Sequence, residues 1–226
     1  MIYNIIMNNI NGLNIEFEVE KMVLDNVNMY LFKAIIIGPD DYEYKEGWER
    51  QQLVRHKADI RITYPYPIND ERNPKKIEKY KNENILNIDG FYVRKQIGED
   101  STKLKGLGYL LFCYAMNYML SVGKPTVVLL DASGGVCNNS EKWAKENNIQ
   151  NSDIGNFYNK LSDIYKTIIP IENKDYLITL MCVAESNSKL VKYYKKLGFK
   201  ETNLNEDPLS VLMESDIDTL LKNCNI

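Results

Sequence analysis

The spacing of apolar and polar residues predicts a series of β-strands in the first half of the chain. Residues 15–20 alternate strictly between apolar and polar side chains, which is the period of a half-buried strand. Residues 29–37 form a second β-rich run, and the two runs are expected to form a hairpin around Asp25-Asn26. Three further strands are expected, at residues 1–7, 58–64 and 85–93.

Three helices are predicted between and after these strands. The longest runs from about residue 105 to residue 122, where apolar side chains recur at the i, i+3, i+4 and i+7 spacings of a helix that is buried on one side. Gly123 is a good residue to end this helix, and Pro125 prevents its continuation. The shorter helices are expected from Asp40 or Asp41 to about Lys57 and from Pro74 through Lys81.

The second half of the chain is predicted to hold two buried strands separated by an insertion. Residues 126–130 and residues 176–183 are apolar runs typical of strands that are covered on both faces. We interpret residues 133–173, between them, as an insertion that contains helices at about 141–147 and 153–168. Beyond it we expect a helix at residues 187–197, strands near Phe199 and at 209–213, and a short final helix.

Composition and charge narrow the class of protein. The chain has 226 residues, 44% of them hydrophobic, which suits one compact domain or at most two small ones. A net charge of −3 implies no basic face overall, so nucleic acid is not expected as a partner. The apolar N-terminus is short, is soon interrupted by asparagines and has no basic residue before it. Neither a signal peptide nor a membrane span is therefore expected.

The cysteines are widely spaced and give no metal-binding pattern. They are Cys113, Cys137, Cys182 and Cys224, and the only histidine is His56. Because no C-x-x-C spacing occurs, a zinc site is not expected. Cys113 and Cys182 lie in apolar segments and are expected to be reduced core residues. A cytoplasmic location follows as the default.

A short basic turn with two glycines opens the predicted long helix. It reads Lys103-Leu104-Lys105-Gly106-Leu107-Gly108. The free N–H groups and the dipole of a helix start attract an anion, the lysines add charge, and glycine permits the close approach of a phosphate. The turn therefore predicts a pyrophosphate site, although a helix start that happens to contain two glycines explains it as well. Dinucleotide-binding, P-loop and kinase motifs all fit the segment less well.

A second segment, residues 187–199, reads as a capped helix that ends in Leu-Gly-Phe. Asn187 is a good N-cap, and Tyr194 lies two turns further along the same face. Gly198 is expected to end the helix, with Phe199 packed back over its last turn. An ordinary amphipathic helix would share these features, but the intervals between them are less common.

In this order the two segments resemble the signature motifs of the GCN5-related N-acetyltransferases, the GNAT superfamily. The family's pyrophosphate turn, [R/Q]-x-x-G-x-[G/A], matches residues 103–108 with lysine in the first place. Its later helix, N-x-x-A-x-x-[L/Y]-Y-x-x-L-G-F, matches residues 187–199 with Leu190 in the small-residue place. Together the motifs cover about the second half of the chain.

The resemblance implies an α/β (α+β) fold with a mixed, mostly antiparallel central sheet flanked by helices. It would form a single domain over residues 1–226. Residues 1–84 would be a divergent acceptor-side part, and residues 85–213 an acetyl-CoA-binding core with the insertion at about 133–173. Either 126–130 or 176–183 is the family's fifth strand. We favour 176–183, because it leads directly into the Asn187 helix.

The resemblance also implies an enzyme that transfers an acetyl group directly from acetyl-CoA to a primary amine. The pantetheine arm would lie along the strand at residues 91–93, and Tyr194 would be the general acid for the departing thiolate. Asp89 is the first choice for the general base, with Asp131 and Glu185 as alternatives. The predicted cofactor-binding residues are Phe91, Tyr92, Val93, Lys103, Leu104, Lys105, Gly106, Leu107, Gly108, Asn187 and Tyr194.

The acceptor and the partners are the least constrained part of the prediction. A small-molecule amine is favoured over a protein, because the insertion could form a wall of the cleft. The alternatives are a non-catalytic domain that binds CoA or an acyl-CoA, and a protein-interaction module. Homodimers are common in the family, but nothing in this sequence decides the oligomeric state.

Overall fold

The computed structural model describes residues 2–10, 13–24, 27–37, 56–68, 74–93, 106–165, 173–204 and 207–224. The chain forms two compact units. The sheet unit comprises Met1–Leu130 and Ser215–Ile226, and the helical unit comprises Asp131–Glu214. The expected organisation as a single domain, divided near residue 84, stays a prediction.

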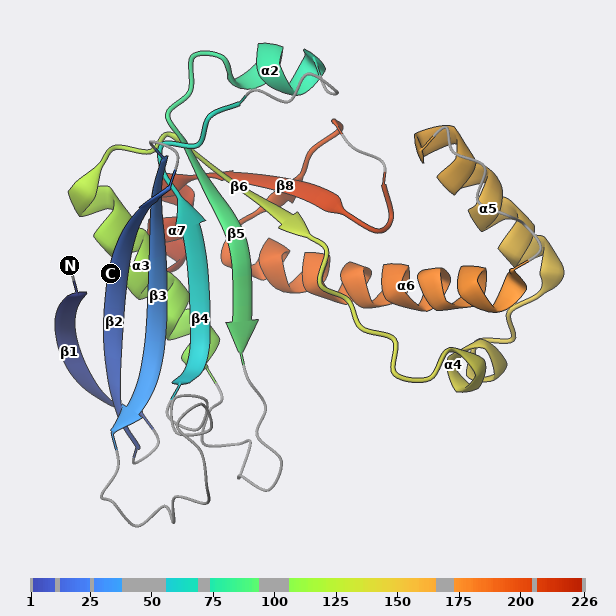
Figure 1. Ribbon diagram of the computed structural model, residues 1–226, viewed down its shortest axis with the longest axis horizontal. Helices are drawn as coiled ribbons and strands as arrows, with labels where there is room; N and C mark the ends of the chain where they lie inside the picture. Colours follow the sequence, from blue (N-terminus) through green and yellow to red (C-terminus); the bar gives the residue numbers. More distant parts are fainter. Residues whose placement is uncertain are drawn as a thin grey trace. The chain divides into compact units, whose positions relative to one another are not determined.

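The sheet unit is built on a mostly antiparallel sheet (Figure 1). Five strands follow one another in sequence and in space, each antiparallel to the next: β1 (Ile2–Ile10), β2 (Leu13–Leu24), β3 (Val27–Ile37), β4 (His56–Thr63) and β5 (Ile85–Val93). β6 (Val127–Ala132) then pairs with β5 in parallel. These pairings confirm the predicted mixed, mostly antiparallel sheet flanked by helices.

Helix α3 (Leu107–Val122) packs against β3, β4 and β5 and supplies much of the core of the sheet unit. The Tyr114 ring of α3 stacks on Phe17 of β2 at 5.1 Å and meets Phe32 of β3 edge-on at 6.0 Å, measured between ring centroids. Phe32 is fully buried, and burial of a side chain of that size contributes about 2–3 kcal/mol. The helical spacing of residues 105–122 predicted a helix that is buried on one side, and this is confirmed except at Leu110 and Val122, which are exposed.

A disulfide fastens the C-terminal helix α7 (Ile217–Asn223) to α3. Cys113 of α3 is bonded to Cys224, which directly follows α7, with the two Cα atoms 5.4 Å apart. Cys113 lies in the core as predicted, but the prediction that it is reduced is wrong. Spacing could not reveal this pair, because the two cysteines are separated by 111 positions and meet only through the packing of α7 on α3.

The other elements predicted in this unit agree with the structure, except for the described end of one helix. The hairpin is confirmed by the register that pairs Leu24 with Val27. Helix α2 (Pro74–Tyr80) begins at the predicted proline. The helix predicted from Asp40 or Asp41 falls mostly on residues 38–55, outside the described residues, and its last two positions, His56 and Lys57, begin β4 instead.

The described part of the helical unit contains three helices and a short antiparallel pair of strands. Their bounds are α4 (Ser140–Glu146), α5 (Asn151–Tyr165), α6 (Lys174–Leu197), β7 (Lys200–Glu201) and β8 (Val211–Asp216), whose last two residues belong to the sheet unit. Ile154 and Leu161 of α5 pack with Leu177 of α6 to form a small core. Helices α4 and α5 confirm the two helices predicted within the insertion.

The strand predicted at residues 176–183 is wrong, because these residues form the first part of α6. The helix is capped by Asn173, whose Oδ1 accepts a hydrogen bond from the Tyr176 amide at 3.1 Å. In an apolar run as short as this one, the spacing of the residues alone does not show whether the run is a buried strand or a buried helix. Packing of Leu177 against α5 favours the helix. Among the described residues, no helix is both long and apolar enough to cross a bilayer.

Candidate functional site

The N-terminus of α3 has an open backbone geometry suited to an anion. Gly106 is the N-cap residue with φ of 89°, in the left-handed region that favours glycine. Its own side chain cannot cap the helix, and a Cβ placed on it would meet no described atom within 4 Å. The first backbone bond of the helix runs from the Leu110 N–H to the Gly106 carbonyl, so within the described part of the chain the N–H groups of residues 107–109 have no intrahelical partner. Lys103, Leu104 and Lys105 lie outside the described residues.

The first turn of α3 lies directly against the end of β5. A Cβ on Gly108 would come within 2.8 Å of Cγ2 of Val93 and 3.4 Å of Cζ of Phe91. A larger residue at this position would require the side chain of Val93 or Phe91 to move. Phe91 also stacks on Phe112 of α3, with the ring centroids 6.2 Å apart. The structure thus brings the predicted cofactor residues 91–93 and 106–108 together.

A β-bulge interrupts the β4–β5 ladder at Asp89. Ile88 pairs with Ile62 and Gly90 pairs with Arg61, so Asp89 is an extra residue on β5. A bulge leaves the extra residue unpaired in the ladder and redirects its side chain, and bulges are over-represented beside active sites. The bulge could not be predicted from the sequence, because it depends on the register of two strands.

Both oxygens of the Asp89 carboxylate accept hydrogen bonds from neighbouring side chains. The Thr63 hydroxyl donates to Oδ2 at 2.6 Å, and the Asn87 amide donates to Oδ1 at 2.6 Å. Asp89 is exposed, so its orientation is fixed by these two bonds rather than by packing. The carboxylate is held at the bulge in one direction.

Asp59 is a buried carboxylate on β4 that sequence reasoning missed. It is 3% exposed and lies opposite Tyr92 in the β4–β5 register. The Tyr92 ring folds back along β5, since a Cβ on Gly90 would lie 2.7 Å from Cε2 of that ring. In the sequence, the sign of a buried carboxylate was a single acidic residue inside the β-like run at residues 58–64.

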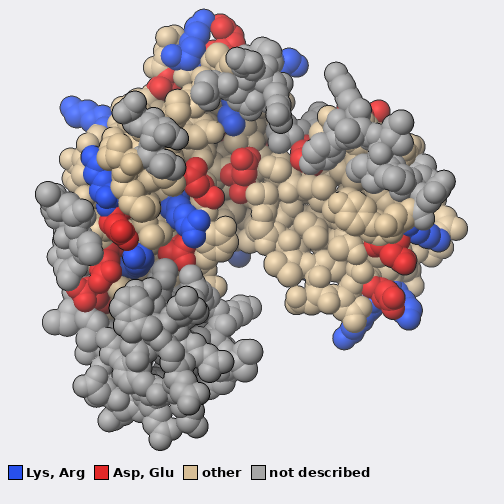
Figure 2. Space-filling model, in the orientation of Figure 1, with Lys and Arg blue, Asp and Glu red and all other residues tan. Residues whose placement is uncertain are grey.

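Charges of both signs are mixed over the strands of the sheet unit. Figure 2 shows basic and acidic side chains interspersed on the face it views, without a large patch of one sign. Lys33 of β3, for example, pairs with Glu20 of β2 at 3.0 Å. The described part of this surface therefore gives no strong electrostatic preference for an anionic or a cationic partner.

Tyr194, the predicted general acid, lies near the C-terminus of α6 in the helical unit. Its side chain is buried, and its ring meets Phe199 edge-on with the centroids 6.1 Å apart. Gly198 ends the helix with φ of 110°, and the Phe199 amide donates to the Tyr194 carbonyl at 3.1 Å. The predicted Leu-Gly-Phe helix end is confirmed. Its neighbour Tyr193 has a pKa raised by partial burial.

Asn187 is fully buried in the middle of α6, so the prediction that it is an N-cap is wrong. Its Oδ1 accepts a hydrogen bond from the Gly135 amide at 2.7 Å, and its Nδ2 donates to the Leu209 carbonyl at 2.9 Å. One side chain thereby joins α6 to the segment after β6 and to the segment before β8. Its amide is occupied by the backbone of these two segments.

The two alternative carboxylates occupy different settings. Asp131 is an exposed residue within β6. Glu185, which was expected to follow a strand, lies inside α6, where the Trp143 indole donates to it and Lys189 pairs with it at 3.1 Å. The hydrogen bond from Trp143 and then that from Lys189 lower the pKa of Glu185. Glu185 is thus held as an anion.

The predicted site residues are divided between the two units. Asp89, residues 91–93 and residues 106–108 belong to the sheet unit, whereas Asn187 and Tyr194 belong to the helical unit. In the described part of the chain, no group of three or more His, Cys, Asp or Glu side chains could hold a metal ion. Comparison with known proteins gave no match to a family model, a curated protein or a solved structure.

Proposed function

We propose that the protein is an acetyl-CoA-dependent N-acetyltransferase of the GNAT type that acetylates a primary amine. The observation that carries the proposal is the contact between the glycine-rich first turn of α3 and the end of β5. It puts a helix start with free N–H groups beside the strand expected to hold the pantetheine arm. One acetyl-CoA molecule could then place its pyrophosphate at the helix start and its pantetheine arm along the strand.

The order of the elements supports the same proposal. β5 leads through α3 to β6, and β5 and β6 are parallel, so the three form one β–α–β unit. Because residues 176–183 are helical, β6 is the segment we assign to the family's fifth strand. Helix α6 then takes the place of the later motif helix, with Tyr194 near its end.

The chemistry that we propose needs three groups besides the cofactor. The amine loses a proton to a base, and Asp89 remains our choice because its carboxylate is held at a bulge on β5. The amine nitrogen attacks the thioester carbonyl carbon, and a backbone N–H released from the ladder at the bulge stabilises the oxyanion. As the C–S bond breaks, the nitrogen would release its second proton to water. Tyr194, the acid that the resemblance implies, would protonate the thiolate of CoA and regain its proton from water.

A non-catalytic domain that binds CoA or an acyl-CoA is the second candidate. The observation in its favour is that both Asp89 oxygens already accept hydrogen bonds, from Thr63 and Asn87. To act as a base, Asp89 must accept a proton at one of these oxygens. The hydrogen bond from Thr63 or Asn87 to that oxygen must break first. For the enzyme, a small-molecule amine remains the proposed acceptor. The possible homodimer and the cytoplasmic location remain predictions. The expected lack of a nucleic-acid or membrane partner also remains a prediction.

Calorimetric titration with acetyl-CoA tests the cofactor, with NAD and ATP as controls. We expect micromolar affinity for acetyl-CoA and no measurable binding of the controls. Gly106→Asp should abolish the binding, because it puts bulk and negative charge where the pyrophosphate would lie. The matched control is Gly155→Asp on α5, where a Cβ likewise meets no described atom within 4 Å and binding should be unchanged.

A panel of primary amines then separates the two candidates. Release of free CoA in the presence of one amine, at a rate above the hydrolysis of acetyl-CoA alone, would support the transferase. Tight binding without transfer to any amine would favour the non-catalytic domain. Wild-type affinity in Gly106→Asp would mean that the cofactor site lies elsewhere.

A further inference from the structure

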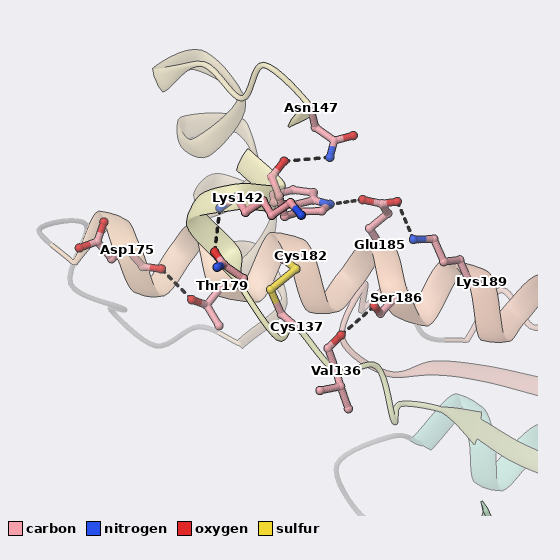
Figure 3. The surroundings of a disulfide bond; sticks show 12 residues. Val136, Cys137, Lys142, Asn147, Asp175, Thr179, Cys182, Glu185, Ser186 and Lys189 are labelled. Carbon is pink, nitrogen blue, oxygen red and sulfur yellow. Dashed lines mark hydrogen bonds and ion pairs between the residues drawn. A yellow bond between two sulfur atoms is a disulfide. The ribbon is translucent and has the colours of Figure 1, made fainter. Parts of the chain in front are cut away.

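The segment between β6 and α4 is attached to α6 at three consecutive residues, and Figure 3 shows the attachments at Val136 and Cys137. The Gly135 amide donates to Oδ1 of Asn187 at 2.7 Å, and the Ser186 hydroxyl donates to the Val136 carbonyl at 3.1 Å. Cys137 is bonded to Cys182, with the Cα atoms 5.6 Å apart. We call residues 133–139 the strap. The prediction that Cys182 is reduced is therefore wrong.

The strap approaches the helix too closely for an ordinary side chain at Gly135. A Cβ there would lie 2.6 Å from Oδ1 of Asn187, 2.7 Å from the Val183 carbonyl oxygen and 2.8 Å from Cβ of Ser186. The strap thus rests on the backbone of α6. Besides this contact, two hydrogen bonds and the disulfide attach the strap itself to α6. Helix α4, which follows the strap, packs on α6 separately and donates to it from the Trp143 indole.

The two disulfides of the chain differ in access. Cys113 and Cys224 are 2% and 6% exposed, so solvent reaches neither sulfur well. Cys182 is 7% exposed, but Cys137 on the strap is partly exposed. A thiol attacks a disulfide at a sulfur atom that it can reach, so access decides which bond exchanges first.

We infer that the Cys137–Cys182 disulfide is a redox-operated clamp: a dithiol reductant opens it and releases the strap from α6, while the Cys113–Cys224 disulfide stays closed. A thiolate of the reductant attacks the Cys137 sulfur, the S–S bond breaks, and Cys182 leaves as a thiolate that takes up a proton. The second thiol of the reductant displaces Cys137 from the mixed disulfide. Two electrons pass to the protein, and the reductant becomes a disulfide.

Release of the strap changes the surroundings of α6 without removing its core. The packing of Leu177 against Ile154 and Leu161 does not involve the strap. Asn187, in contrast, holds the strap through Gly135, so its buried Oδ1 loses this partner when the strap leaves, while its Nδ2 keeps the bond to the Leu209 carbonyl. The clamp therefore controls one hydrogen bond of a buried polar residue inside the helical unit. This inference does not rest on the proposed acetyl transfer.

Limited reduction of the native protein tests the clamp. Dithiothreitol is added at low concentration, samples are alkylated over time, and the modified cysteines are measured by peptide mass spectrometry. We expect Cys137 and Cys182 to be alkylated at least about tenfold sooner than Cys113 and Cys224. Hydrogen exchange of residues 133–139 should speed up in step with that reduction.

Two double variants provide the controls. Cys137→Ser with Cys182→Ser should show fast exchange in the strap without reductant, and Cys113→Ser with Cys224→Ser should keep the slow exchange. Equal reduction rates for the two disulfides, or unchanged exchange in the strap after reduction, would overturn the inference. Four free thiols in protein isolated under air would overturn it as well. The wild-type time course decides the matter even if a variant fails to fold.

Discussion

The two units of this chain each contain one disulfide, but the bonds join very different surroundings. In the sheet unit, Cys113 lies in a large aromatic and aliphatic core, on a helix that packs Tyr114 against two phenylalanines. In the helical unit, the buried core centred on Ile154 is small, and the Cys137–Cys182 bond holds a strap fixed otherwise by two hydrogen bonds. Small units with thin cores depend on such cross-links, whereas large cores do not.

The chain-entropy estimate for the two bonds sharpens this contrast. It gives about 4 kcal/mol for the separation of 45 residues and about 4.7 kcal/mol for the separation of 111. The values are nearly equal, so loop length does not distinguish the bonds. The two bonds are distinguished by the packing that remains around the cysteines after each bond is reduced.

The largest effect should come from the core of the sheet unit. Phe32→Ala removes a fully buried ring that meets both Tyr114 and Tyr118, and should lower the free energy of unfolding by about 3–5 kcal/mol. The matched variant in the helical unit is Leu161→Ala, for which we expect about 2–3 kcal/mol. Urea unfolding measures both. A greater loss in Leu161→Ala would contradict the view that the helical unit has the thinner core.

Asn187→Ala should cost about 2–4 kcal/mol, because it leaves the Gly135 amide and the Leu209 carbonyl without their hydrogen bonds. The control is Asn117→Ala in α3, where the amide only donates to the Cys113 carbonyl one turn earlier. There the loss should stay below about 1 kcal/mol. Equal losses in the two variants would show that Asn187 does not hold the helical unit together.

Tyr194→Phe tests whether the helical unit contributes to the proposed chemistry as well as to stability. We expect turnover to fall about a hundredfold while the affinity for acetyl-CoA stays close to wild type, because the hydroxyl is needed only when the thiolate leaves. Tyr193→Phe, at the neighbouring exposed position, is the control. Unchanged turnover in Tyr194→Phe would remove this tyrosine as the general acid.

The smallest effect should appear at Glu185. The hydrogen bond from Trp143 lowers the pKa of Glu185 below its ordinary value of 4.5, so its contribution to stability is complete above that pH and is lost as the pH falls through the lowered value. Because Glu185 is partly exposed, the contribution should be under about 1 kcal/mol. Trp143→Phe should reduce the difference in unfolding free energy between pH 7 and pH 3. An unchanged difference would show that this hydrogen bond is not the cause.

The sheet unit could be predicted from the sequence because its pattern is local. The alternation at residues 15–20 reflects one face of β2 packed towards α3 and the other turned to solvent, and each strand pairs with the next. The apolar spacing from Leu107 to Val122 likewise predicted that α3 is buried on one side, although Leu110 and Val122 are exposed. In both cases a residue's environment follows from its position within its own element.

The helical unit was harder to predict because its contacts are not local. Residues 176–183 are apolar enough for a strand, and the packing of Leu177 on α5 together with the cap at Asn173 favours the helix. Asn187 looks like a helix cap in sequence, but it is a buried link between segments about 20 and 50 residues away. For the candidate site, the glycines at the start of α3 were predictable, whereas the bulge at Asp89 and the buried Asp59 were not.

The disulfides also could not be predicted from the sequence, and they affect the predicted cytoplasmic location. A cytoplasmic protein was expected on the ground that Cys113 and Cys182 were reduced, and both are bonded. Disulfides are typical of oxidising compartments, so the cytoplasmic location stays a prediction that has lost this support. The number of free thiols in the isolated protein measures whether the two disulfides are formed.

The two disulfides are nested along the chain. The bond from Cys113 to Cys224 closes a covalent ring, and the whole of Asp131–Glu214 lies within it, with the smaller Cys137–Cys182 ring inside. A protease that cuts once in α4 or α5 therefore opens the peptide backbone without separating any fragment. The nicked protein should migrate as one species on a non-reducing gel and as two after reduction. The oxidised chain thus tolerates a break in its helical unit that would divide the reduced chain in two.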